Sequence, residues 1–277
     1  MIWLELVCVA ILSLYLGVRL RREPAPAGLL GRLALLSVAS WLGENSVIHA
    51  YAFYQYAPGF HLFVDRVPLL IVLIWPVVIH SAWDLARALS GGPTPRAVLG
   101  GALLVLADAA LIEPISVTAG LWSWNAPGLL GVPPVGVLGW AYFTVACLAV
   151  FAVAERRGRP ALCLAALVVG PLAVHAAVVV SWWGALRWVS ATLPPWPVVA
   201  VAAAVSAGTC YLAATREAPR RVLRTDLLVR IPPVIFFLVL LALHAHRAPA
   251  LVAYTLCFAP PWVILTIRAL PSGPQAV

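Results

Sequence analysis

The chain has 277 residues, of which 63% are hydrophobic and 10% are charged. This composition excludes a water-soluble globular domain, because such a chain cannot hide so many apolar residues in one core. The net charge of +8 comes from arginines scattered through short segments, which indicates membrane topology and contact with anionic lipid headgroups, not nucleic-acid binding. We therefore expect a multi-pass protein of the cell inner membrane that contacts membrane lipid and no nucleic acid.

Nine apolar runs are long enough to cross a bilayer, since about 20 helical residues span the hydrocarbon core. Backbone polar groups in lipid must be satisfied within each segment, and the runs lack the alternation of barrel strands. The sequence therefore predicts an all-α transmembrane bundle that forms one integral-membrane domain, residues 1–277. The eighth run is the shortest, so eight spans are the alternative. The runs cover residues 2–18, 29–53, 67–88, 97–118, 134–154, 161–186, 194–215, 228–243 and 249–267.

All 18 basic residues are arginines, and nine spans distribute them unequally between the two sides of the membrane. Fifteen fall on one side, and only Arg66, Arg187 and Arg247 fall on the other. Because positive residues concentrate in cytoplasmic loops, we expect the N-terminus outside and the C-terminus in the cytoplasm. The densest cluster, from Arg216 to Arg230, is interpreted as a topology signal, with docking of a cytoplasmic partner as the alternative.

The five cysteines are distributed one per span without CxxC spacing, at Cys8, Cys147, Cys163, Cys210 and Cys257. This spacing predicts neither a disulfide framework nor a metal site. The chain also has no Gly-rich phosphate loop, HExxH motif or DDxxD-type diphosphate motif. We therefore expect no metal and no cofactor.

The second span carries a buried acid followed by a group of tyrosines. Counted from the cytoplasmic end at a rise of about 1.5 Å per residue, Glu44 lies past the midplane and Tyr51, Tyr54 and Tyr56 reach the outer interface. An ionisable side chain at this depth is costly and typical of a functional site. The alternative is an interhelical hydrogen bond or ion pair of Glu44 with His80 or His175.

The fourth span contains two more acids, Asp108 near the midplane and Glu113 in the outer half. A carboxyl group in such surroundings loses its hydration, which favours the protonated form that can act as a general acid. Five residues turn a helix by about 140°, so the two acids do not share a face of an ideal helix. Their convergence on one cavity with Glu44 is a hypothesis that depends on a local shift at Pro114.

Tryptophans flank the turn Gly131-Val132-Pro133-Pro134, at Trp122, Trp124 and Trp140. Tryptophan at a membrane interface is first of all an anchoring residue. The alternative is a substrate wall, because aromatic faces stabilise a cation and glycines allow a rigid chain to approach closely.

Residues 41–141 contain a spread of positions that match a known pattern: Gly43-Glu44, Tyr51, Tyr54-Gln55-Tyr56, Val67-Pro68-Leu69, Trp75, Asp108, Glu113-Pro114, Trp122-Ser123-Trp124, Gly131-Val132-Pro133 and Gly139-Trp140. With these residues the segment resembles the integral-membrane carotenoid biosynthesis family that includes the carotenoid hydratases of the myxoxanthophyll and bacterioruberin routes. Two positions depart from the family pattern. Glu113-Pro114 stands where the family usually has Asp-Pro, and Gly136 stands where it usually has Asn, which removes an amide that could position water.

The resemblance implies a cofactor-independent hydratase that adds water to the terminal double bond of an acyclic carotenoid end, as in lycopene or γ-carotene. It implies Asp108, Glu113 and Glu44 as catalytic residues, and other carotenoid enzymes as partners. Substrate contacts are expected from Tyr51, Tyr54, Trp75, Trp122, Trp124 and Trp140. The same acid and cation chemistry would serve a carotenoid cyclase or isomerase. Intramembrane acids and proline-broken helices are also typical of a transporter of a small or lipidic solute.

Overall fold

The computed structural model describes residues 1–215 and 224–269, and helices make up most of this part of the chain. The long helices are α1 (Ile2–Leu20), α2 (Pro26–Tyr51), α3 (Leu69–Ser90), α4 (Pro95–Thr118), α5 (Pro134–Arg156), α6 (Ala166–Ser181), α8 (Pro195–Thr215) and α10 (Ile231–His244). The shorter ones are the 3-10 helix η1 (Pro160–Ala165), the π-helical turn η2 (Trp182–Leu186), α7 (Arg187–Val189), α9 (Arg224–Leu228), the 3-10 helix η3 (Ala245–Arg247), α11 (Pro249–Leu256) and α12 (Ala259–Ala269).

Within the described residues, nine helical segments are long and apolar enough to cross a membrane, which confirms the predicted all-α bundle. The uncertain eighth span runs over 22 residues, from Asp226 to Arg247. Several spans begin at a proline, among them Pro26, Pro95 and Pro134. Proline suits the first turn of a helix because the N–H that it lacks would have no partner within the helix.

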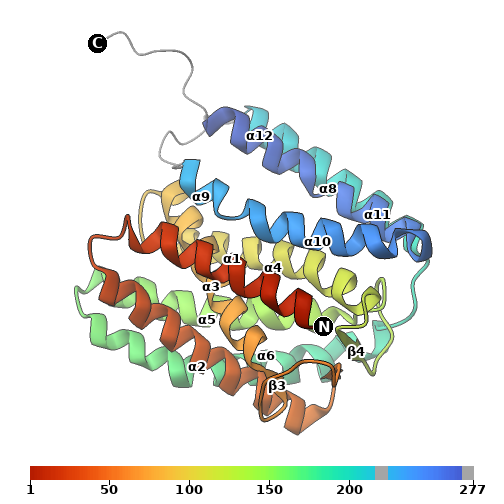
Figure 1. Ribbon diagram of the computed structural model, residues 1–277, viewed down its shortest axis with the longest axis horizontal. Helices are drawn as coiled ribbons and strands as arrows, with labels where there is room; N and C mark the ends of the chain where they lie inside the picture. The colour runs from red at the N-terminus through yellow and green to blue at the C-terminus, as the bar shows by residue number, and fades with distance from the viewer. Residues whose placement is uncertain (216–223, 270–277) are drawn as a thin grey trace.

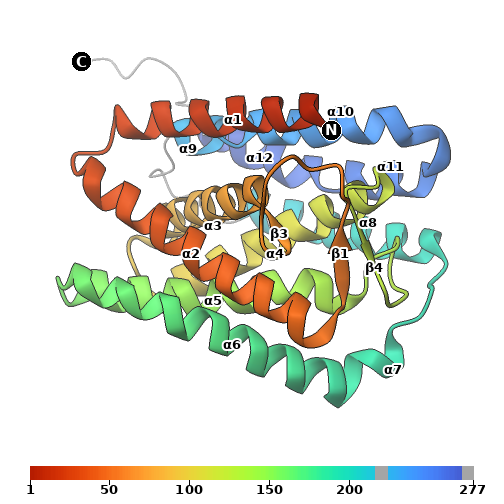
Figure 2. The ribbon, with the colours of Figure 1, turned by 60° about the horizontal axis from the view of Figure 1, so that its bottom comes forward.

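The central helices α3 and α4 run between two outer layers, as the two views show together (Figures 1 and 2). In Figure 2, α1 and α10 cover one side, and α2 and α6 cover the other. Small residues let the central helices approach closely, as is common where helices pack in lipid. A Cβ atom at Gly101 of α4 would lie only 2.6 Å from Leu148 Cδ1 of α5. The functional residues are therefore held by a tightly packed centre.

Two short antiparallel ladders lie in the connections at one end of the bundle, where the all-α prediction included no strands. Strand β1 (Tyr54–Tyr56) pairs with β4 (Trp122–Trp124), and β2 (Phe63–Val64) pairs with β3 (Val67–Pro68). The loops after α2 and α4 reach the same end of the molecule, so their backbone groups can satisfy each other. The β1–β4 ladder joins the two loops that follow the acid-bearing helices.

Arg230 was counted with the cytoplasmic arginines, although the predicted eighth run, residues 228–243, includes it. In the structure it lies near the start of the eighth span and forms an ion pair with Asp108 of α4. A charge at this position is tolerated because a partner neutralises it. Arg216, Arg220 and Arg221 lie outside the described residues. The orientation of the termini stays a prediction.

That orientation can be tested with reporter fusions. We expect green fluorescent protein fused after Val277 to fluoresce in the cytoplasm, because most arginines remain on that side even without Arg230. Alkaline phosphatase fused after Asn125, in the loop between α4 and α5, should be active outside the cytoplasm. A silent C-terminal fluorophore together with an inactive phosphatase would show the opposite orientation.

Candidate active site

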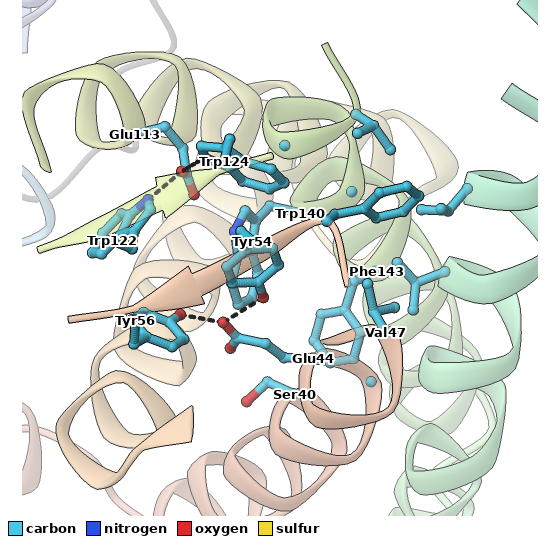
Figure 3. Close-up of a pocket in the computed structure, with 17 residues that line it drawn as sticks. Ser40, Glu44, Val47, Tyr54, Tyr56, Glu113, Trp122, Trp124, Trp140 and Phe143 are labelled. Atoms are coloured by element: carbon cyan, nitrogen blue, oxygen red, sulfur yellow. Dashed lines mark hydrogen bonds between the residues drawn. The ribbon is translucent and has the colours of Figure 1, made fainter. Parts of the chain in front are cut away.

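Two buried carboxyl groups from different helices lie beside one small pocket (Figure 3). Glu44 of α2 is 8% exposed and Glu113 of α4 is 3% exposed. The pocket has a volume of about 60 Å³. It is lined by Ser40, Gly43, Glu44, Val47, Phe53, Tyr54, Tyr56, Glu113, Trp122, Trp124, Val135, Gly136, Gly139, Trp140, Phe143, Val174 and Val178. We call this space the acid pocket.

The β1–β4 ladder supplies each acid with two hydrogen-bond donors. Alternate residues of a strand point to the same face, so Tyr54 and Tyr56 lie beside Trp124 and Trp122 of the paired strand. Both tyrosine hydroxyls donate to Glu44 Oε1, and Tyr54 does so at 2.8 Å. The indole N–H groups of Trp122 and Trp124 donate to Glu113 Oε2 at 2.8 and 3.2 Å. Four aromatic side chains therefore orient two carboxyl groups.

These donors determine where a proton can sit. An indole nitrogen only donates, so both tryptophan bonds occupy lone pairs of Glu113 Oε2. A proton on Glu113 must therefore be carried by Oε1. Burial first, and then the nearby Glu44 charge, raise the pKa of Tyr54 and Tyr56 well above the usual range of a phenol. Both phenols consequently keep their protons and act as donors to Glu44.

No arginine or histidine is among the described residues that line the acid pocket. Two carboxylates in one apolar pocket without a counter-ion repel each other, and neither is well hydrated, so at most one of them ionises readily. Phenol hydroxyls are stronger donors than indole N–H groups, which favours the negative charge on Glu44. The arrangement can therefore hold one proton on Glu113 and one charge on Glu44.

Aromatic rings surround the space between the two acids. The ring centroids of Tyr54 and Trp124 lie 4.5 Å apart, and those of Tyr56 and Trp122 lie 5.6 Å apart. Trp140 of α5 closes another side, with Phe143 one helical turn away. The faces of such rings stabilise a positive charge at short range. Chemically, the pocket can protonate an apolar group and stabilise the cation that results.

Gly136 makes room for one of the four donors. A Cβ atom at this position would lie 2.5 Å from Cζ2 of Trp124. Any side chain here, including an asparagine, would therefore displace the indole that donates to Glu113. The position of Trp124 therefore explains why residue 136 carries no amide side chain.

Asp108 lies apart from the other two acids. It is paired with Arg230 and lines a second cavity, to which Glu44 and Glu113 do not contribute. The predicted convergence of all three acids is therefore wrong for Asp108. The reason is geometric, because α4 continues as a helix through Pro114 and keeps the rotation between residues 108 and 113.

Two of the expected substrate contacts also lie outside the acid pocket. The Tyr51 hydroxyl bonds to His175 Nδ1 at 2.9 Å, and its ring packs against Trp183. Trp75 stacks on the pocket residue Trp140, with ring centroids 3.6 Å apart, and lines the second cavity. Tyr54, Trp122, Trp124 and Trp140 do line the acid pocket.

Neither histidine that was considered as a partner of Glu44 contacts it. His80 bonds to the Tyr15 hydroxyl, and His175 bonds to Ser46 and Tyr51. The hydrogen bonds of Glu44 come instead from the loop that follows its own helix. Among the residues that the structure describes, no group of three His, Cys, Asp or Glu side chains is placed to hold a metal ion.

Eleven of the residues that line the acid pocket were not among the predicted site residues, and for two of them, Tyr56 and Ser40, the sequence carried a recognisable signal. Tyr56 follows Tyr54 at a spacing of two, as Trp124 follows Trp122, which is typical of paired strands with one functional face. Ser40 precedes Glu44 by four residues and therefore lies on the same face of α2. The contribution of α6, through Val174 and Val178, has no such signal because these valines do not differ from the many other apolar residues of the helix.

Comparison with known proteins agrees with the resemblance and extends it. A family model described as a carotenoid biosynthesis protein matches residues 2–209, which is most of the chain and well beyond residues 41–141. No curated protein and no solved structure matches the chain.

Glycine substitutions test the packing around Trp124. We expect Gly136→Ala to destabilise the protein by about 1–3 kcal/mol, because the added methyl group overlaps the indole. Gly139→Ala is the matched control, since it lies on the same helix and a Cβ atom there would meet no atom within 4 Å. Thermal unfolding in one detergent measures both variants. Equal midpoints would contradict the proposed packing.

Proposed function

The chain belongs to the carotenoid biosynthesis protein family, and from this membership we propose that it hydrates the terminal double bond of an acyclic carotenoid end. The family gives the protein a role in carotenoid biosynthesis, a carotenoid substrate and a membrane setting. One observation carries the proposed reaction. Two buried carboxyl groups, each with two aromatic donors, share a pocket whose lining, over the described residues, contains no basic side chain.

The size of the acid pocket supports reaction at the end of the substrate. Pockets that enclose a drug-sized ligand have volumes of about 300–1,000 Å³. At about 60 Å³, the acid pocket takes a branched end group or a few water molecules, but not a whole polyene. The remainder of the substrate must therefore extend out of this pocket.

The first step is proton transfer from Glu113. Oε1 gives its proton to the less substituted carbon of the terminal double bond, and the π electrons of that bond form the new C–H bond. The positive charge is left on the tertiary carbon, while Glu113 becomes a carboxylate. The ring faces of Tyr54, Trp124 and Trp140 stabilise this cation. The two indole N–H groups stabilise the new carboxylate through Oε2.

The second step is capture of the cation by water. A lone pair of water forms the C–O bond, and Glu44 accepts the proton that water loses. Ser40 donates its own hydroxyl hydrogen to the Ser37 carbonyl at 3.1 Å, which leaves its lone pairs to accept a hydrogen bond from water. The product is a tertiary alcohol. Transfer of the proton from Glu44 back to Glu113 through water restores the starting state.

A carotenoid cyclase or isomerase is the second candidate, and the apolar lining of the acid pocket is the observation that favours it. Ser40 is the one hydroxyl side chain, apart from the two tyrosines, among the described residues that line the pocket. If water does not reach the cation, a neighbouring double bond or loss of a proton quenches it. Membership in a biosynthesis family favours either enzyme over a transporter.

Pigment analysis separates these reactions. Expressed in a host that accumulates lycopene or γ-carotene, the chain should produce a carotenoid heavier by one water, detected by chromatography and mass spectrometry. An isomer of unchanged mass would support the cyclase or isomerase instead. Unchanged pigment with either substrate, despite verified expression in the membrane, would contradict both.

Substitution of the two acids tests their separate roles. We expect Glu113→Gln to reduce product formation by about 10²–10⁴-fold, because the amide cannot protonate the alkene. Glu44→Gln should reduce the hydrated product and increase the share of products in which the cation has lost a proton. Asp65→Asn is the control, since this exposed carboxyl lies at the same end of the bundle outside the acid pocket. An active Glu113→Gln variant would exclude Glu113 as the acid.

A further inference from the structure

A second, larger cavity lies on the other side of α4 from the acid pocket. Its volume is about 570 Å³, and its walls come mainly from α1, α3, α4, α10 and α12. Trp122 borders both cavities, and Trp75 of the second cavity stacks on Trp140 of the acid pocket. Indole rings therefore separate two chambers.

The second cavity is elongated along the helices. Its lining on α1 extends from Met1 to Tyr15, which corresponds to about 21 Å at the rise of an α-helix. Met1, Phe60 and Trp122 border the end near the strands, and Ser81 and Asp108 border the opposite end. Most of the surface between these ends is apolar. The shape fits a single extended lipid chain.

The end of the second cavity that Ser81 and Asp108 border is polar but carries no net charge. Arg230 donates to Ser81 Oγ at 2.8 Å and forms an ion pair with Asp108, and its guanidinium lies 5.2 Å from the ring centroid of Trp262. Because Asp108 neutralises Arg230, the site offers hydrogen bonding without attraction for an anion. A neutral hydroxyl group, which both donates and accepts, matches this end better than a carboxylate or phosphate.

Two buried hydroxyl groups strengthen the case for a polar ligand. Ser116 and Thr255 line the second cavity at 0% and 4% exposure, and neither side-chain oxygen has a hydrogen-bond partner in the described part of the chain. Leaving such a group unsatisfied costs about 1–3 kcal/mol. Tyr254 donates to the Ala110 carbonyl at 3.2 Å, so α11, which carries Thr255, packs against α4 within one turn of Asp108.

We propose that the second cavity is a binding site for a neutral isoprenoid alcohol, with its hydroxyl group at Asp108, Arg230 and Thr255 and its chain extended toward Trp122. The isoprenoid nature of the chain rests on the proposed function. The recognition of a neutral hydroxyl does not rest on the proposed function, because it follows from the paired charges of Asp108 and Arg230 and from the unsatisfied hydroxyl of Thr255. The hydroxylated product of the proposed reaction belongs to the same chemical class.

Binding of radiolabelled geranylgeraniol to the purified full chain in nanodiscs tests this site. We expect saturable binding of one molecule per chain, and about tenfold weaker binding of the methyl ether, which cannot donate to Asp108. Equal binding of the ether and of the saturated hydrocarbon phytane would overturn the proposal. Tighter binding of geranylgeranoic acid would overturn it as well, because an anion would then be preferred.

Variants test whether the alcohol binds in the second cavity. Ile112→Trp should abolish binding by filling the second cavity, whereas Leu103→Trp, on the lipid-exposed side of the same helix, should leave it unchanged. Thr255→Val preserves the side-chain shape and should weaken binding of the alcohol but not of the ether. Unaltered binding in both Ile112→Trp and Thr255→Val would place the ligand elsewhere and overturn the proposal.

Failure of the second binding site can be distinguished from failure of the proposed reaction. Glu113→Gln should lose turnover and still bind geranylgeraniol, since Glu113 does not line the second cavity. If Glu113→Gln retains turnover while Ile112→Trp loses binding, Glu113 is not the acid of the proposed reaction, and the second site stands. If Glu113→Gln loses turnover and no variant affects binding, the reaction stands and the second site is wrong.

Discussion

The mutual repulsion of Glu44 and Glu113 in a pocket without a counter-ion is the constraint on which the proposed chemistry depends. Because both carboxyl groups cannot readily ionise together, one proton is retained where an apolar end group can meet it. The β1–β4 ladder stabilises this state by directing two phenols to Glu44 and two indoles to Glu113. The three residues of β1 and the three residues of β4 thus give the two similar acids different hydrogen-bond donors.

Indole rings connect this pocket to the rest of the bundle while keeping the two cavities apart. Trp122 donates to Glu113 and borders both spaces, and the stacked pair of Trp75 and Trp140 lies between them. The ion pair of Asp108 and Arg230 stays on the far side of this wall. A charge pair close to Glu113 would weaken the retention of its proton, so the separation supports the role of the acid pocket.

Much of the fold could be predicted because lipid imposes a length on each helix. The second span was expected over residues 29–53 and is the helix Pro26–Tyr51, and the fourth was expected over 97–118 and is Pro95–Thr118. The strands could not be predicted in this way, since each has only two or three residues and depends on a partner from another loop. The partner of Arg230 could not be predicted for a related reason, because Asp108 lies across the bundle on another helix.

The sequence by itself determined that this is a multi-pass membrane protein with costly acids in its second and fourth helices, and its residue pattern indicated the carotenoid biosynthesis family. Apolar length and the energetic penalty of a charge in lipid are local properties, so they can be read from one chain. Only the tertiary structure decided that Glu44 and Glu113 share a pocket while Asp108 pairs with Arg230. That choice depends on helix rotation and on contacts between distant segments, which no local pattern specifies.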